Sequence, residues 1–153
     1  MLDEESISIV AASPEDYAWC AQLMASSEPW LTLRRDRADD EAALKRPASD
    51  LFIVFQKQQR IGLLLLQSSG LAGSPYIAAI AVVPQERGLG VGTKMLDFAE
   101  QCYPQAGNIF LCVSDFNAGA RELYARRGYA VVGELSDYVV VGHSELIMRK
   151  KLR

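Results

Sequence analysis

The residues best suited to bind a ligand are glycines that alternate with other residues behind an arginine. The segment Arg87-Gly88-Leu89-Gly90-Val91-Gly92-Thr93 follows an apolar run that ends at Val83 and Pro84. Apolar residues at helical spacing come next, namely Val91, Met95, Phe98, Ala99 and Cys102. The pattern predicts a strand, a glycine-rich loop and a helix. Glycine lets a backbone approach a ligand closely, and free N–H groups at a helix start favour an anion, so we expect a phosphate cradle.

The spacing of the glycines separates the common phosphate-binding loops. A P-loop needs Gly-Lys-Ser or Gly-Lys-Thr, but Gly92 is followed by Thr93 and Lys94. A dinucleotide loop needs G-x-G-x-x-G; Gly88 and Gly90 match its first half, but position 93 is threonine. A nucleotide-binding module is therefore disfavoured. The plain alternative is a turn that binds nothing, although each such glycine costs about 1 kcal/mol relative to alanine near a helix start.

What does fit is R-x-x-G-x-G, formed by Arg87, Gly90 and Gly92. This pattern resembles the acyl-CoA pyrophosphate loop of the GNAT superfamily of N-acetyltransferases. The strand 80–84, with its terminal proline, resembles that family's fourth strand. The segment 117–129 (NAGARELYARRGY) is similar to its second signature, N-x-x-(A)-x-x-x-Y-x-x-x-G-F/Y. The likeness extends from about Ile7 to Leu152, so we expect a single N-acetyltransferase domain over residues 1–153.

The resemblance implies acetyl-CoA as acyl donor and no metal. The loop 87–93 would hold the pyrophosphate with backbone N–H groups, and Arg87 would add positive charge. The backbone of Ile80, Ala81 and Val82 would pair with the pantetheine amides like an added strand. Asn117 would contact the same arm, although asparagine also suits a helix N-cap. The predicted cofactor-binding residues are Ile80, Ala81, Val82, Arg87, Gly88, Leu89, Gly90, Val91, Gly92, Thr93, Asn117 and Tyr124.

Tyr124 is the predicted catalytic residue. When an amine attacks the thioester, the leaving thiolate benefits from a proton, and a phenol can donate one as a general acid. The alternative is a core tyrosine on the apolar face of its helix. No general base is visible, because strand 76–83 has no carboxylate where the family often has a glutamate. A water chain or an amine that arrives neutral would also serve, and the candidate side chains near the expected acceptor mouth are Glu28, Asp137, Tyr138 and His143.

The segment 28–33 is expected between the first two helices, where the family builds its acceptor pocket. Trp30 beside Glu28 could receive a cationic amine, and anchoring of the loop by Trp30 is an equal alternative. The loop 137–143 is expected to form the opposite wall. The predicted substrate-binding residues are Glu28, Trp30, Tyr76 and Tyr138.

Composition limits the other functions. Half of the 153 residues are hydrophobic, 23% are charged, and the net charge of −3 does not indicate a nucleic-acid surface. Cys20, Cys102 and Cys112 lack metal-ligand spacing and lie in apolar patterns, which predicts buried, reduced thiols and a cytoplasmic protein. The acidic N-terminus is not a signal peptide, and turn residues interrupt the uncharged stretch 61–85, so no membrane span is expected.

The elements that must position these residues follow from local patterns. We expect strands at 6–11, 51–56, 60–67, 76–83, 108–113, 129–134 and 144–150, and helices at 13–26, 36–45, 90–102 and 116–126. The resemblance implies an α+β fold, in the order β-α-α-β-β-β-α-β-α-β-β. It has a mixed, mostly antiparallel sheet of about seven strands with helices on both faces. Its fourth and fifth strands would part to admit the cofactor.

The sequence thus predicts transfer of an acetyl group from acetyl-CoA to a primary amine by direct attack in a ternary complex. The rival from another class is a non-catalytic acetyl-CoA-binding regulator on the same fold, which the missing carboxylate on strand 76–83 favours and Tyr124 disfavours. A homodimer is compatible with the resemblance, although no residue indicates one.

Overall fold

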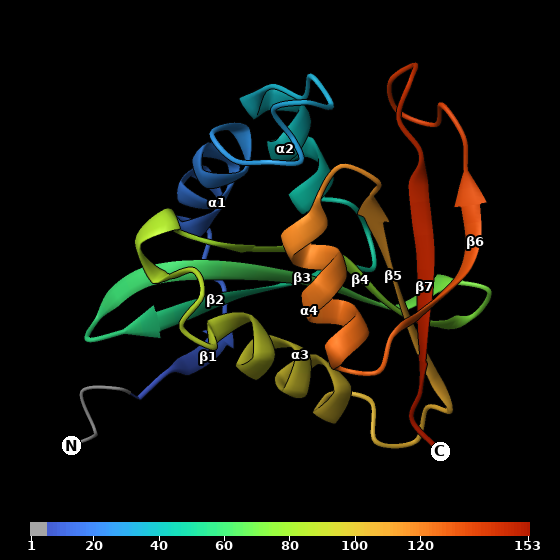
Figure 1. Ribbon diagram of the computed structural model, residues 1–153. Coiled ribbons are helices and arrows are strands. Elements are labelled where there is room, and N and C mark those ends of the chain that lie inside the picture. Colours follow the sequence, from blue (N-terminus) through green and yellow to red (C-terminus); the bar gives the residue numbers. More distant parts are fainter. Residues whose placement is uncertain (1–5) are drawn as a thin grey trace.

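A seven-stranded sheet forms the centre of the computed structural model, which describes residues 6–153 (Figure 1). The strands lie in the order β1-β2-β3-β4-β5-β7-β6 and are antiparallel, apart from the parallel pair β4–β5. Their bounds are β1 Ser8–Ala11, β2 Asp50–Gln56, β3 Gln59–Leu71, β4 Ser74–Val82, β5 Asn108–Ser114, β6 Ala130–Leu135 and β7 Glu145–Lys151. The predicted fold class and element order are confirmed.

The helices cover both faces of the sheet, as Figure 1 shows. Their bounds are α1 Asp16–Ala25, α2 Arg37–Leu44, α3 Val91–Gln101 and α4 Ala118–Arg126, with a short 3₁₀ turn at Pro84–Glu86. The leucine run of β3 explains this double cover. Leu64 and Leu66 belong to the core beneath α3 and α4, whereas Leu63 and Leu65 belong to the core beneath α1. Alternate side chains point to opposite faces, so a strand buried on both sides is apolar throughout.

The strands β4 and β5 part soon after they meet. Their registered pairs are Tyr76 with Phe110 and Ile77 with Leu111. Beyond them β4 continues to Val82 and β5 to Ser114, and no further pair between the two strands occurs in the described part of the chain. The predicted parting of these strands is therefore confirmed, and it opens a gap at the carboxyl ends of both.

Some predicted element boundaries are wrong. The helix expected from Ser13 begins at Asp16, and no side chain caps it. The Asp16 carboxylate instead accepts hydrogen bonds from the backbone N–H of Ser13 (2.7 Å) and from Nε of Arg60 on β3 (2.7 Å). This ion pair ties the start of α1 to the sheet. Helix α4 begins at Ala118 rather than 116, because the Asn117 side chain accepts from the N–H of Ala120 and acts as its N-cap.

The cysteines are free, but they are not all buried. Cys20 is fully buried, and burial raises the pKa of its thiol to about 12. Cys112 is half-buried, and Cys102 is exposed because it lies at the C-cap of α3. The prediction of three buried thiols is therefore wrong for Cys102. None of the helices within residues 6–153 combines the length and the apolar character that crossing a membrane requires.

Candidate functional site

The gap between β4 and α4 holds a cleft of about 480 Å³. Its walls come from the end of β4, the loop and first turn of α3, and the exposed side of α4. The lining residues are Glu28, Ile80, Ala81, Val82, Glu86, Arg87, Gly88, Gly90, Gly92, Thr93, Asn117, Gly119, Ala120, Leu123, Tyr124 and Arg126. The structure thus brings most of the predicted cofactor-binding residues to one cleft, although Leu89 and Val91 do not line it.

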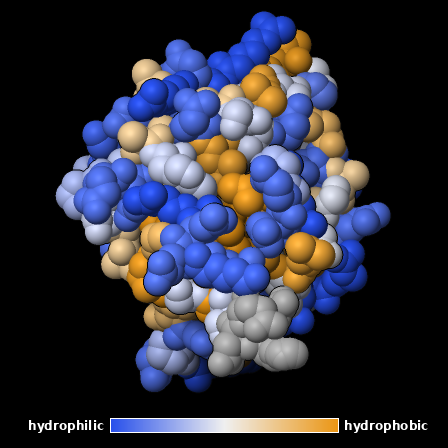
Figure 2. Space-filling view, turned by 90° about the vertical axis from the view of Figure 1, so that its left-hand side faces the viewer, coloured by the Kyte–Doolittle hydropathy of each residue, from blue (hydrophilic) through white to orange (hydrophobic). Residues whose placement is uncertain are grey.

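The lining mixes apolar and charged side chains. Figure 2 shows the side of the molecule that carries α1 and the loop after β4, where hydrophobic groups form a strip between hydrophilic ones. A long ligand with charged and apolar parts suits such a surface.

The glycine-rich loop presents free amides to the cleft. Gly88 and Gly90 have φ angles of +76° and +88°, a region that residues with a side chain rarely adopt. Gly90 is the N-cap of α3. Within residues 6–153, the backbone N–H groups from Gly88 to Thr93 donate no hydrogen bond, and the first helical donor is Lys94, which bonds to Gly90 O. These amides and the positive end of the helix dipole make the loop suitable for an anion.

Gly92 lets α3 approach α4 closely. A Cβ on this residue would lie 2.8 Å from Cδ2 of Leu123, so any larger residue requires Leu123 to move. The three glycines therefore have two functions: Gly88 and Gly90 turn the backbone, and Gly92 permits helix packing at the floor of the cleft.

The Arg87 side chain folds back onto β4. Its Nε donates to the Val82 carbonyl (2.8 Å) and its Nη2 to Ser27 Oγ (3.4 Å). The guanidinium thus links the end of β4 to the end of α1, at the edge of the cleft. Its predicted contact with a pyrophosphate stays a prediction and requires the side chain to leave these partners.

The backbone of β4 faces the cleft at alternate residues. Val83 N donates to Ile61 O, and the register pairs Ala81 with Leu63. Because hydrogen-bonded pairs alternate along antiparallel strands, Ala81 turns its N–H and C=O toward β3, while Ile80 and Val82 turn theirs toward the gap. Ile80 can therefore pair with a ligand amide, as can Val82 once Arg87 leaves its carbonyl, whereas Ala81 offers the cleft its small side chain.

Tyr124 lies deep in the cleft wall. It is 6% exposed, its ring centroid is 6.2 Å from that of Tyr129, and its hydroxyl donates no hydrogen bond within the described residues. Burial raises the pKa of Tyr124 well above its ordinary value. The side chain is thus both a core residue and a protonated phenol beside the cleft, so the two readings of the sequence are compatible.

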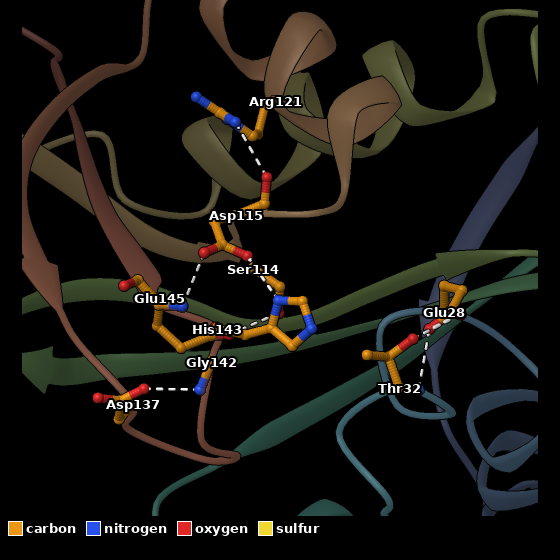
Figure 3. A network of polar contacts seen from close by, with 10 residues as sticks. Glu28, Thr32, Ser114, Asp115, Arg121, Asp137, Gly142, His143 and Glu145 are labelled. Atoms are coloured by element: carbon orange, nitrogen blue, oxygen red, sulfur yellow. Dashed lines mark hydrogen bonds and ion pairs between the residues drawn. The ribbon is translucent and has the colours of Figure 1, made fainter.

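The expected mouth lies between two loops. Glu28, in the segment between α1 and α2, accepts hydrogen bonds from the backbone N–H (3.0 Å) and the hydroxyl (2.8 Å) of Thr32. In the segment between β6 and β7, His143 Nδ1 lies 3.1 Å from Asp115 Oδ1, and its ring packs edge-on against Phe116. Figure 3 shows Glu28 and Thr32 across from the His143 ring. The two loops therefore bring candidate acids and bases to one region.

The Asp115 carboxylate is held in place by hydrogen bonds at this mouth. Its Oδ2 accepts from the backbone N–H of Ser144 (2.9 Å), and this bond is the main cause that lowers the pKa of Asp115; His143 adds to the effect. Asp137 instead accepts from the N–H of Gly142 (2.6 Å) and so stabilises its own loop. Tyr138 is 67% exposed.

Trp30 packs against the core beneath α1. This contact favours loop anchoring over substrate binding.

Several residues of the site do not stand out in the sequence. Glu86 and Arg126 line the cleft, and Arg126 places a cation there from the last turn of α4. Glu145, at the start of β7, accepts a hydrogen bond from the Ser114 hydroxyl at the end of β5. Tyr76, by contrast, is one of the predicted substrate-binding residues; it lies beside Cys112 and close to Glu145, and burial is the main cause that raises its pKa. The weak signal for Glu145 was a lone carboxylate in an otherwise apolar strand start, two residues after the single histidine.

Comparison with known proteins shows which family this chain resembles. The model of the acetyltransferase (GNAT) family matches residues 14–129. An N-acetyltransferase of Methanocaldococcus jannaschii, described as uncharacterized, is 37% identical over 82 residues. The matched region makes up 52% of this chain and 53% of that protein, so it spans about half the length of this relative.

Solved structures share the whole fold. An aminoglycoside 6′-N-acetyltransferase complexed with coenzyme A has a TM-score of 0.75 at 14% identity, covering 95% of this chain and 97% of that one. The ribosomal-protein-S18-alanine N-acetyltransferase of Escherichia coli has a TM-score of 0.75 at 18% identity, covering 96% and 94%. At these identities the likeness establishes the fold alone.

Proposed function

The chain belongs to the acetyltransferase (GNAT) family, whose model matches residues 14–129 of 153, and on that premise we propose that it transfers an acetyl group from acetyl-CoA to a primary amine. The observation that carries the proposal is the cleft itself. Free amides lie at one end of it, cleft-facing backbone of β4 lies along one wall, and a buried phenol lies in the other.

We propose one direction for acetyl-CoA in this cleft. Its pyrophosphate would bind the amides between Gly88 and Thr93, where the helix dipole adds a favourable field. Its pantetheine arm would run back along β4 and pair with Ile80 and Val82 as an added strand does. Arg126 would supply a cation for a further phosphate. The aminoglycoside acetyltransferase with the same fold is complexed with coenzyme A, which supports this use of the cleft.

The chemistry we propose is direct attack in a ternary complex. The amine nitrogen would attack the thioester carbonyl, and Tyr124 would protonate the sulfur as the carbon–sulfur bond breaks. A phenol is protonated at neutral pH, as a general acid requires, and burial, which raises the pKa of Tyr124, preserves that state.

We infer the class of acceptor from the family and from the acidic residues at the mouth of the cleft. The two structural relatives act, by their names, on an aminoglycoside and on a ribosomal-protein alanine, and both present a primary amine. Glu28, Asp115 and Asp137 give the mouth of this chain acidic character, which suits an ammonium group. Free thiols at all three cysteines support a reducing compartment such as the cytoplasm. A homodimer stays an expectation from the family.

Calorimetry tests the proposal first. Acetyl-CoA and CoA are each titrated into the protein, with ATP as the control ligand. Binding of both acetyl-CoA and CoA, with no response to ATP, supports the assignment of the cleft as the cofactor site. Release of thiol is then followed with kanamycin and with a peptide that begins with alanine. Thiol release that depends on an amine supports an enzyme. Binding without release from any amine would favour the non-catalytic regulator, which the absence of a carboxylate on β4 also favours.

A further inference from the structure

A cluster of polar side chains lies where β4 and β5 part, on the sheet face away from α3 and α4. Ser114 stands opposite Glu145 and Cys112 opposite Ile147, so these side chains share a face. The intervening Leu111, Val113 and Leu146 belong to the core beneath α3 and α4. The Ser114–Glu145 pair therefore points to the side from which the α1–α2 segment approaches (Figures 1 and 3).

This cluster lies at the point that a thioester would reach. The β4–β5 pairing ends at Ile77 and Leu111, and Cys112 and Ser114 follow directly on β5. An arm that pairs with Val82 and runs along β4 to Ala78 covers about 13 Å. Its end would then stand between Tyr124 on one side of the sheet and Glu145 on the other. An acid and a base on opposite sides of the reacting carbon are what amine attack and thiolate departure need.

Glu145 has the properties of a base. It is half-buried, and no lysine, arginine or histidine forms an ion pair with it in the part of the chain that the structure describes. Burial, more than the negative charge of Asp115, raises the pKa of Glu145, while the Ser114 hydrogen bond opposes the rise. A carboxylate with a raised pKa binds a proton more strongly and is a better general base.

We propose that Glu145 is the general base, which removes a proton from the acceptor ammonium directly or through one water, and that Ser114 positions it. The proposal rests on the proposed function and deepens it. The acceptor would enter between the α1–α2 segment and the β6–β7 segment, on the face where Glu145 lies. Glu145 would thus be the base that β4 lacks.

The protons balance in this scheme. The ammonium gives one proton to Glu145, and the neutral nitrogen attacks the thioester carbonyl to form the carbon–nitrogen bond. As the carbon–sulfur bond breaks, Tyr124 gives its proton to the thiolate. The second proton leaves the nitrogen and restores the Tyr124 hydroxyl, either directly or through water. Glu145 then releases its proton to solvent, so each turnover yields the amide, CoA thiol and one proton.

The test compares Glu145→Gln with Glu134→Gln. Glutamine keeps an oxygen that can accept from Ser114 but cannot take a proton, and Glu134 is an exposed glutamate on the neighbouring strand β6. Both variants are assayed for thiol release with kanamycin and with the alanine peptide, for CoA affinity by calorimetry and for melting temperature. We expect Glu145→Gln to lower kcat about 100-fold or more, with unchanged CoA affinity, and Glu134→Gln to match the native protein.

The pH profile separates a base from a structural residue. The groups that face Glu145 are Ser114, Asp115 and Cys112 near the end of β5, Tyr76 of β4, and Tyr138 and His143 of the β6–β7 segment. A base must be ionised, so native kcat/KM should fall as pH decreases through the raised pKa of Glu145. The Glu145→Gln variant should lose that limb, and Glu145→Asp should recover part of the rate with a shifted limb.

Each outcome has one meaning. A Glu145→Gln rate within threefold of Glu134→Gln overturns Glu145 as the base. If His143→Gln abolishes the acidic limb instead, His143 is the base and the proposal is equally wrong. Native protein that binds acetyl-CoA but acetylates neither amine contradicts the proposed function itself, and the Glu145 proposal with it.

Discussion

At the scale of single residues, a substitution at Tyr124 best separates cofactor binding from the chemical step. Its hydroxyl has no partner within residues 6–153, and its ring packs in the core. Replacing it with phenylalanine therefore keeps the packing and removes only the proton donor. We expect Tyr124→Phe to lower kcat about 100-fold, the lower end of what general acid catalysis contributes, with CoA affinity unchanged.

Tyr129→Phe is the matched control. Tyr129 is also buried, but its hydroxyl bonds to Glu100 (3.1 Å) away from the cleft. This variant should lose about 1 kcal/mol of stability and keep its turnover. Equal turnover in Tyr124→Phe and native protein would exclude the phenol as the acid.

Arg126 gives a second prediction at this scale. Coenzyme A carries a 3′-phosphate that dephospho-CoA lacks, and Arg126 is a cation of α4 that lines the cleft. We expect Arg126→Ala to weaken CoA binding about tenfold, the loss of roughly one charge-assisted hydrogen bond. Its affinity for dephospho-CoA should change little. Calorimetry with both ligands checks this, with Arg37→Ala on α2 as the control. If both ligands weaken equally, Arg126 does not contact the 3′-phosphate.

Sequence patterns predict those residues whose proposed function depends on their neighbours along the chain. The glycines between 88 and 92 stand next to the helix that they begin, so spacing alone indicates a cradle. Glu145 gave no comparable signal, because its partners Ser114 and Tyr76 lie 31 and 69 positions away and meet it only through the sheet. Arg126 was missed for a similar reason. Its place on the cleft side of α4 depends on how that helix packs.

At the scale of elements, the junction between β4 and α3 depends on Gly90. This residue has a φ of +88°, and a Cβ there would meet open space, so the cost of alanine is conformational alone. We expect Gly90→Ala to destabilise the protein by about 1–2 kcal/mol and to weaken CoA binding, because relief of the strain turns the loop amides. Denaturant unfolding and calorimetry measure the two effects. Gly107→Ala, with open space and no positive φ, should change neither. Intact CoA affinity in Gly90→Ala would show that the loop does not hold the anion.

Element positions were more predictable than element ends. The leucines of β3 identified a strand because they alternate between two cores, and the register with β2 and β4 follows from that burial. The predicted start of α1 is wrong because Ser13 and Pro14 resemble a helix cap in the sequence. In the structure the helix begins at Asp16, whose carboxylate pairs with Arg60, 44 positions away. Local propensity cannot anticipate an ion pair that the sheet brings together.

At the scale of the whole molecule, the sheet consists of two parts. The strands β1 to β4 form one part and β5 to β7 the other, and the registered pairs between them are confined to Tyr76–Phe110 and Ile77–Leu111 among the described residues. A shared core that includes Leu64, Met95 and Leu111 holds the parts together from the side of α3 and α4. The cleft opens where this connection ends, and its walls come from β4 on one side and from α4, which joins β5 to β6, on the other.

A ligand that contacts both β4 and α4 should restrict the local opening of both, whereas a ligand that binds one wall should restrict that wall alone. At a hundredfold excess over its Kd, acetyl-CoA should raise the free energy of unfolding by about 2.7 kcal/mol. For a chain of this size that corresponds to a rise of about 5–10 °C in melting temperature. Hydrogen exchange should show new protection at Ile80 and Val82 on β4, in the loop 88–93, and around Asn117 at the start of α4. Adenosine 3′,5′-bisphosphate, which lacks the pantetheine arm, should protect the loop alone. If acetyl-CoA also left β4 unprotected, the arm would not run along that strand. Glu145 would then have no thioester beside it, and the arrangement of acid and base across the sheet would be wrong.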